Sequence, residues 1–225
     1  MVKVKPTLLH LTGALVLASL LSLGLLIGGA ITDAGEGYSY MAWNLALGWL
    51  PLVFMLGLLR MLLRKRWSSW EGIGLSVLWL GFLPNSFYMV SDLIHIQEAA
   101  PETVLFTTVM LVSFALNGLL LGYVSLYLFH NELRRRMPDR TARHIVALIL
   151  LLCSYAIYLG RDLRWNTWDV VANPAGLLFD ISNRVISPFS YPRMFIVTGI
   201  FFVLLATMYY VLWNIISVLR VPARR

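Results

Sequence analysis

The sequence of 225 residues holds one cysteine and few charged side chains. A single thiol, Cys153, excludes an intrachain disulfide framework and a multi-cysteine metal site. Charged residues make up 13% of the chain, against roughly 25% in soluble proteins, and hydrophobic residues make up 59%, against roughly 45–50%. This composition excludes a soluble fold. Intrinsic disorder and nucleic-acid binding are excluded as well, because the net charge of +7 comes from short basic clusters between long apolar runs. What is present is the composition of a polytopic membrane protein.

Six stretches without Asp, Glu, Lys or Arg are candidates to cross a bilayer. A span needs about 20 mostly apolar residues, because every backbone polar group must be paired inside the segment. We expect an all-α membrane bundle in a single domain, residues 1–225, with spans at about 7–32, 38–60, 72–91, 103–130, 144–160 and 194–219. The first stretch follows Lys3 and Lys5 as a signal peptide would, but its apolar core exceeds the roughly 7–15 residues of such a signal, which predicts a retained helix.

Basic residues predict the orientation of these spans. They form four clusters, around Lys3, Arg64, Arg135 and Arg224. With six spans all four clusters lie on one side, whereas the alternate segments 33–36 and 92–102 contain no Lys or Arg. The positive-inside rule then places both termini in the cytoplasm. The run Arg134-Arg135-Arg136 could also bind an anionic lipid headgroup, although a determinant of topology is the favoured interpretation.

The segment 161–193, between the fifth and sixth spans, is too long for a plain connector. Its apolar part, Val170–Phe179, is broken by Pro174 and is too short to cross a bilayer. We expect an interfacial or re-entrant segment on the extracytoplasmic side, with an aromatic belt at the same interface that includes Trp165 and Trp168.

Unusual polar and aromatic side chains gather toward this predicted extracytoplasmic face. The candidate ligand-binding residues are Asn44, Asn85, Arg161, Arg164, Trp165, Asn166, Trp168 and Asp169. A helix that continued past residue 161 would carry both arginines and both tryptophans on one face, where guanidinium groups could hold a phosphate or carboxylate. The alternative, favoured as the default, is that Asp92, Asp162 or Asp169 pairs with these arginines and only ties helix ends together. Deeper in the membrane, Asn117 must find a partner on another helix.

Asp92 and His95 are the candidates for proton chemistry. Their spacing places them on one helical face, where the carboxylate could orient the imidazole for acid–base catalysis. A capped helix end at the interface explains the pair equally well. The remaining histidines, His10, His130 and His144, lie toward the cytoplasmic side, which excludes a histidine-rich zinc site and leaves only oxygen ligands for a hard cation. We expect no metal and no cofactor.

Several of these residues occur in motifs that resemble a known family. The motifs are Phe82–Tyr88 (FLPNSFY), Asp92–His95 (DLIH), Asn117–Gly122 (NGLLLG) with Ser125-Leu126, and above all Tyr158–Asp169 (YLGRDLRWNTWD). The chain resembles, over most of its length, a bacterial integral-membrane family known as domain of unknown function 1361. It departs from the family's pattern at Ser86, Phe87 and Asp162. The resemblance implies a protein of the bacterial cytoplasmic membrane and supplies no reaction.

Two classes of function remain open. The favoured one is a non-enzymatic membrane component: a permease, a solute- or lipid-binding protein, or a subunit of a membrane complex, whose outward polar cluster binds an anionic group. Its partners would be membrane lipids, an anionic small molecule or lipid headgroup, and other membrane proteins. The alternative is an intramembrane enzyme that acts on a lipid-linked or anionic substrate, with Asp92 and His95 as acid and base and Arg161 and Arg164 as an anion clamp.

Overall fold

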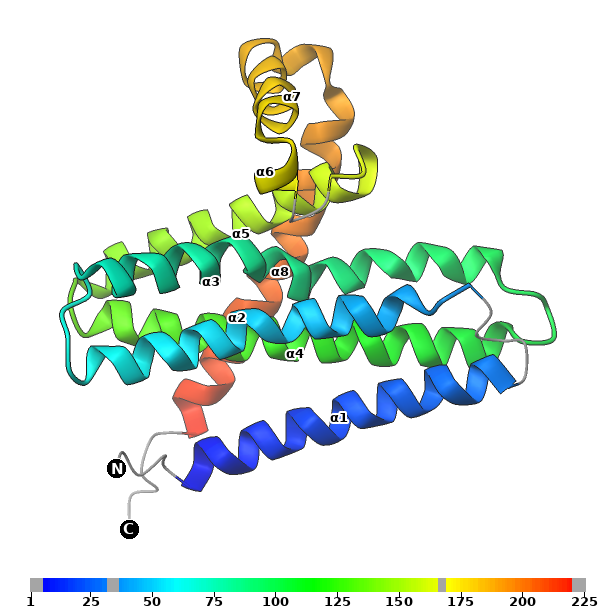
Figure 1. The fold of residues 1–225 in the computed structure, drawn as a ribbon, viewed down its shortest axis with the longest axis horizontal. Helices are drawn as coiled ribbons and strands as arrows, with labels where there is room; N and C mark the ends of the chain where they lie inside the picture. Colours follow the sequence, from blue (N-terminus) through cyan, green and yellow to red (C-terminus); the bar gives the residue numbers. More distant parts are fainter. Residues whose placement is uncertain (1–5, 32–36, 166–168, 220–225) are drawn as a thin grey trace. The chain divides into compact units, whose positions relative to one another are not determined.

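All regular elements in the part of the chain that the structure describes are helical. The computed structural model describes residues 6–31, 37–165 and 169–219. In chain order the elements are α1 (Pro6–Ile31), α2 (Tyr40–Leu62), α3 (Trp70–Tyr88), the 3₁₀ helix η1 (Met89–Glu98), α4 (Val104–Arg134), α5 (Asp139–Asp162), α6 (Asp169–Ala172), α7 (Pro174–Ile186), the 3₁₀ helix η2 (Pro188–Ser190) and α8 (Pro192–Leu219) (Figure 1).

Within the described residues, six helices are long and apolar enough to cross a membrane. They are α1, α2, α3 with its extension η1, α4, α5 and α8. Large apolar side chains such as Leu17 and Ile200 are exposed along these helices, as expected of surfaces that face lipid instead of water. The prediction of an all-α, multi-pass membrane protein with six spans is therefore confirmed. Contacts divide the chain into two compact units, residues 1–125 and 126–225.

The fifth span is longer than the sequence-based prediction. We expected it at 144–160, but α5 begins at Asp139 and has 24 residues. The difference arises because Arg140 and Arg143 lie inside its first turns. Arginine can extend a charged head out of the apolar zone while its aliphatic stem packs along the helix, so charge does not end the helix where it ends the apolar run. The fifth span is therefore long enough to cross a bilayer.

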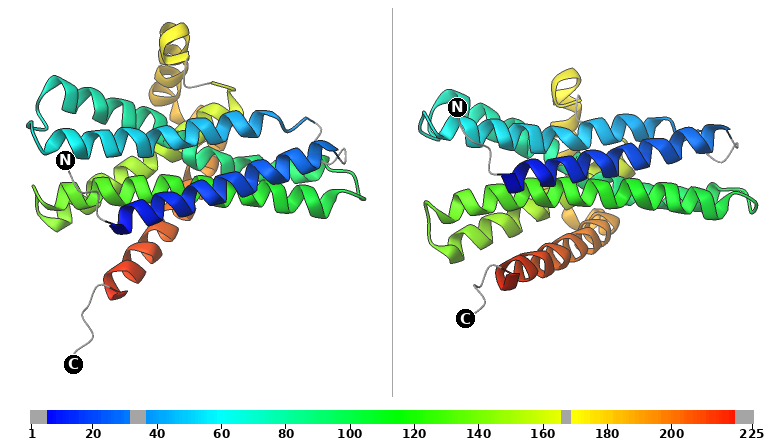
Figure 2. Two further views of the ribbon diagram at one scale, coloured as in Figure 1. Left: turned by 60° about the horizontal axis from the view of Figure 1, so that its bottom comes forward. Right: turned by 90° about the horizontal axis from the view of Figure 1, so that it is seen from below.

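The first unit is built on close helix contacts. The helices α2 and α3 pack side by side as a hairpin, as both views of Figure 2 show. The hydroxyl of Ser86 on α3 donates to the Gly48 carbonyl on α2, over 2.8 Å. Gly118 on α4 lies so close to α3 that a Cβ added there would be 2.3 Å from the Ser86 carbonyl oxygen. Small residues at these contacts let the helices of this unit approach one another closely.

One serine joins three helices of the first unit. The Ser19 hydroxyl on α1 accepts hydrogen bonds from Trp49 Nε1 on α2 and from Asn117 Nδ2 on α4, each over 3.0 Å. It donates its own proton to the Leu15 carbonyl. The expected partner of Asn117 on another helix is thus Ser19.

In the second unit, α7 packs onto the ends of α5 and α8. The side chains of Tyr158, Leu159 and Met194 form a buried cluster, and Leu177 and Ile181 of α7 pack against it. Local sequence starts α7, because Asn173 caps its N-terminus by accepting a 3.1 Å hydrogen bond from Gly176 N, and Pro174 follows at the first helical position. Cys153 of α5 is fully buried.

Candidate functional site

The candidate site begins where α5 ends. The helix stops at Asp162, and Arg164 has a φ of 59°, in the left-handed region. The chain then turns back, and Trp165 N donates to the Leu159 carbonyl over 3.2 Å. The helix therefore does not continue past Asp162, so the condition under which both arginines and both tryptophans would share one helical face is not met. A left-handed residue just after a helix reverses the chain, and this position is normally taken by glycine.

The turn forms one wall of an open cleft with a volume of about 550 Å³. Its walls come from the end of α5, from η2 and from the start of α8. The lining residues are Tyr158, Arg161, Asp162, Leu163, Arg164, Ser190, Tyr191, Pro192 and Arg193. The lining contains three arginines and one aspartate, so the cleft carries a net positive charge. Guanidinium groups and tyrosine hydroxyls are suitable donors for a phosphate or a carboxylate.

The single aspartate of the cleft has a partner within it. Asp162 accepts hydrogen bonds from Arg193 Nε at 2.6 Å and from Arg193 Nη2 at 3.3 Å. This ion pair joins the last residue of α5 to the second residue of α8. The partner of Asp162 is thus Arg193, and not Arg161 or Arg164, the two arginines for which the sequence predicts an internal ion pair.

Behind the cleft lies a buried arginine on α7. Arg184 donates from Nε to the Tyr158 hydroxyl over 3.2 Å and from Nη1 to the Asp180 carbonyl over 2.8 Å, and its guanidinium lies 4.7 Å from the centre of the Tyr191 ring. Burial by itself would lower the pKa of Arg184, but the bond to Tyr158 and the charge of Asp180 outweigh it and raise the pKa. Trp165 Nε1 donates to Asp180 Oδ2 over 2.8 Å. These contacts hold two cleft tyrosines in place.

Arg184, Arg193 and both tyrosines were missed by sequence reasoning, although one signal was present. The segment from 161 to 193 carries four arginines, whereas the two segments predicted on the same side, 33–36 and 92–102, carry no Lys or Arg. Arginine on the side that the positive-inside rule disfavours indicates a specific use. That signal points to Arg184 and Arg193 as directly as to Arg161 and Arg164.

The candidate residues of the first unit have other partners. Asn44 Nδ2 donates to Asp92 Oδ2 over 3.2 Å, and Asp92 is buried. His95 Nδ1 lies 2.9 Å from Glu98 Oε2, three residues along the 3₁₀ helix, where side chains at this spacing are eclipsed. Asn85 donates within its own helix, to the Phe82 carbonyl.

Tyr38 closes the same end of the first unit. Its hydroxyl donates to the His95 carbonyl over 3.0 Å, which ties the chain before α2 to η1. Burial raises the pKa of Tyr38, and the nearby carboxylate of Glu98 raises it further. Tyr38 therefore stays protonated and keeps this hydrogen bond throughout the physiological pH range.

Of the remaining candidates, Asp169 is the first residue of α6, while Asn166 and Trp168 lie outside the described residues. Within residues 6–31, 37–165 and 169–219, no group of three or more His, Cys, Asp or Glu side chains could hold a metal ion.

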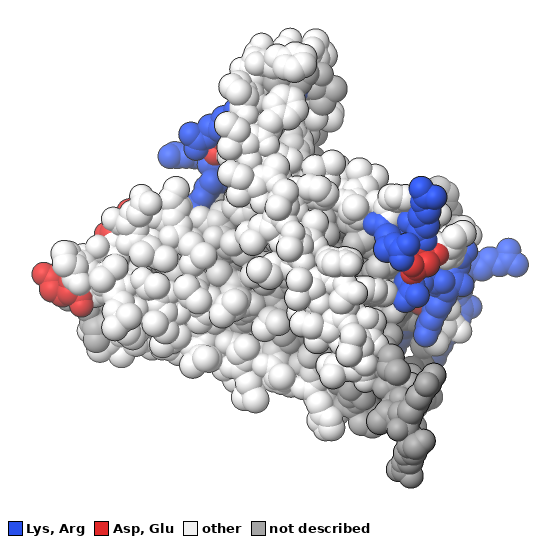
Figure 3. All heavy atoms as spheres, turned by 180° about the vertical axis from the view of Figure 1, so that it is seen from behind, with Lys and Arg blue, Asp and Glu red and all other residues white. Residues whose placement is uncertain are grey.

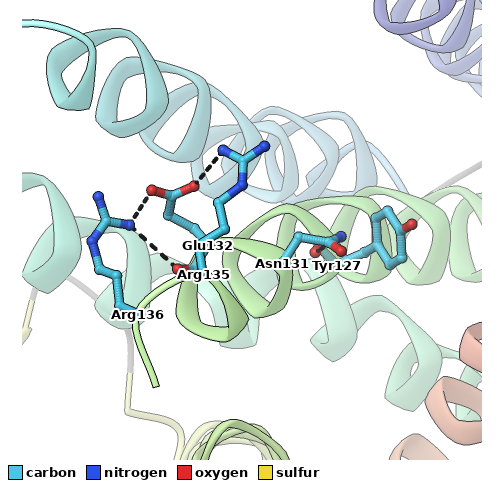
Figure 4. A network of polar contacts seen from close by, with 5 residues as sticks. All are labelled: Tyr127, Asn131, Glu132, Arg135 and Arg136. Carbon is cyan, nitrogen blue, oxygen red and sulfur yellow. Dashed lines mark hydrogen bonds and ion pairs between the residues drawn. The ribbon is translucent and has the colours of Figure 1, made fainter. Parts of the chain in front are cut away.

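The basic run at the end of α4 is held by internal ion pairs. Glu132 is buried, and Figure 4 shows its carboxylate between the guanidinium groups of Arg135 and Arg136. Arg134 pairs with Asp139 at the start of α5. These contacts give the run a structural role in joining α4 to α5, beside its expected role in topology.

Comparison with known proteins identifies a family but no characterised relative. The model of a family described as "Protein of unknown function (DUF1361)" matches residues 43–208, which include every residue of the cleft. No curated protein matches the chain, and no solved structure matches it.

Proposed function

The chain belongs to the DUF1361 family of unknown function, and from the geometry of its cleft we propose that it is a membrane protein that binds an anionic group. Arg161, Arg164 and Arg193 supply the charge, and Tyr158 and Tyr191 supply hydroxyl donors beside them. The class of anion is one with several acceptor oxygens, such as a phosphate, because guanidinium groups donate in pairs to such oxygens.

The observation that carries the proposal is the backbone of Arg164. A non-glycine residue in the left-handed region costs about 1 kcal/mol or more, and such residues concentrate at functional sites. Glycine would form the same turn without this cost. An arginine that lines a positive cleft from this conformation is best explained by what its side chain binds.

The proposal includes a sidedness. The four basic clusters favour cytoplasmic termini, which places the cleft on the extracytoplasmic side of a bacterial cytoplasmic membrane. The segment from α6 to η2 then lies at that outer interface, because α7 is about 20 Å long at 13 residues and cannot cross the roughly 30 Å hydrocarbon core.

We assign no catalytic role to Asp92 and His95. Each side chain engages a neighbour, Asn44 in one case and Glu98 in the other, and these bonds fit a secured helix end. A binding protein or the binding subunit of a membrane complex is the function that the cleft supports best.

Binding of inorganic phosphate and pyrophosphate to the purified protein in detergent tests the proposal. We expect pyrophosphate to bind by calorimetry and to raise the thermal midpoint, and the variant Arg164→Gln to bind it at least about tenfold more weakly through loss of charged hydrogen bonds. Arg143→Gln is the matched control, because Arg143 pairs with Asp139 at the far end of α5 and should leave binding unchanged. Equal affinity in the wild type and in Arg164→Gln would contradict the proposal.

A further inference from the structure

The helix α7 exposes large apolar side chains, with the polar Ser182 between them, on the face that points away from α5 and α8. Its inward face is formed by Leu177, Ile181 and Arg184, which contact α5 and α8. On the opposite face Phe179 is 67% exposed and Ile186 is 77% exposed, two turns apart along the helix. Contact of these side chains with water is unfavourable, and apolar residues on both sides of a helix are typical of one whose second side is also covered, by protein or by lipid.

The apolar face continues to the edge of the cleft. Phe189, in η2, is 92% exposed, and the next two residues, Ser190 and Tyr191, line the cleft. Figure 3 shows the α7 region, at the top, as an uncharged surface with basic side chains gathered beside its base. Apolar surface and arginines therefore adjoin one another within the second unit.

This juxtaposition has the chemistry of a lipid site. A soluble anion requires the arginines alone and gives no reason for Phe179, Ile186 and Phe189 to be exposed. A lipid phosphate lies at the level of the headgroups, and its chains begin just below, where amphipathic helices insert their apolar faces. One lipid molecule would then contact both the arginines of the cleft and the exposed apolar side chains beside them.

We propose, on the basis of the anion-binding function above, that the cleft takes the phosphate of a membrane lipid whose acyl chains lie along α7. Arg161, Arg164 and Arg193 bind the phosphate oxygens. Phe179, Ile186 and Phe189 contact the upper part of the chains. The source of the anion is thus the surrounding bilayer.

The test separates the lipid from a free phosphate. The wild type and two double variants are reconstituted in nanodiscs of phosphatidylcholine with phosphatidylglycerol, and lipid retained on the protein is measured by native mass spectrometry. One variant is Arg161→Gln with Arg164→Gln; the other is Phe179→Ser with Ile186→Ser, at two positions whose side chains are exposed. Val218→Ser is the control, since Val218 is exposed at the far end of α8.

We expect the wild type and Val218→Ser to retain phosphatidylglycerol. Both double variants should retain at least about tenfold less of this lipid. The serine variant should still bind pyrophosphate like the wild type, because its arginines are intact. Lipid retention by the serine variant at the wild-type level would overturn the lipid inference and leave the anion site standing. Unchanged binding of both pyrophosphate and lipid in the arginine variant would overturn the proposed function as well.

Discussion

The two units of the chain use polar side chains in opposite ways. In the first unit neutral polar groups are bonded to one another across helices, as Ser19 is to Trp49 and Asn117. In the second unit Arg161, Arg164 and Arg193 line an open cleft, with the buried Arg184 behind them. The first arrangement satisfies donors and acceptors where no water is available, and the second leaves charge accessible to a ligand.

We therefore expect substitutions in the first unit to affect stability and substitutions of cleft residues in the second unit to affect binding. Substitution of a polar residue in the first unit removes a contact that holds helices together. Substitution of a cleft arginine removes charge from the proposed anion site. Four substitutions test this expectation.

The largest effect should come from Gly118→Ala. The added methyl group would lie 2.3 Å from the Ser86 carbonyl oxygen, so α3 and α4 must separate, at a cost of about 3 kcal/mol. Thermal unfolding in detergent, followed by tryptophan fluorescence, should show a lower midpoint. Gly81→Ala is the matched control, because a Cβ at Gly81 meets nothing within 4 Å, and it should not lower the midpoint.

Arg184→Ala should destabilise the second unit by about 2 kcal/mol, because it removes the ion pair with the Asp180 carboxylate and the hydrogen bond to Tyr158. The same thermal measurement applies. Arg143→Ala is its control, since Arg143 is exposed and forms an ion pair only within one helix, worth less than about 0.5 kcal/mol. Equal midpoints for the two variants would show that Arg184 is not a structural residue of the cleft.

Ser19→Ala should cost about 1 kcal/mol, since an interhelical hydrogen bond in a membrane protein is worth about that much and the partners can shift. It removes the acceptor shared by Trp49 and Asn117. Ser22→Ala is matched to it, because Ser22 is also buried on α1 but donates only within that helix, to the Ala18 carbonyl. An equally large decrease of the midpoint in Ser22→Ala would show that the interhelical hydrogen bonds of Ser19 add no stability of their own.

The smallest change in stability should come from Arg164→Gly, and it should be a gain of about 0.5–1 kcal/mol, since glycine adopts the left-handed turn without strain. Pyrophosphate binding should fall at the same time. A variant that is more stable and binds less would place Arg164 on the functional side of the comparison. A loss of stability with binding retained would place it on the other side.

The sequence predicts the spans well, because the bilayer imposes a length and a polarity that hydropathy records directly. It is less accurate at the ends of the helices, as α5 shows, because the stems of Arg140 and Arg143 extend a helix past its apolar run. It also predicts that Asn117 needs an interhelical partner, but not that the partner is Ser19, 98 residues earlier in the chain.

Only a small part of the cleft could be found from the sequence. Arg161 and Arg164 are adjacent to a helix end and were recognised as candidates. Arg193 and Tyr191 reach the same cleft because the chain reverses through α7. The left-handed turn at Arg164 has no glycine, which is the usual sequence signal of such a turn. Contacts that depend on a chain reversal between distant residues leave no periodic pattern to detect.

The complete burial of Cys153, the one thiol in the chain, makes the natural protein inert to water-soluble maleimides. Each cysteine introduced at an exposed position is therefore the single labelled residue, without a cysteine-free background. Ser190→Cys at the edge of the cleft and Arg66→Cys between α2 and α3 would then report, in intact cells, which end of the molecule a membrane-impermeant reagent reaches.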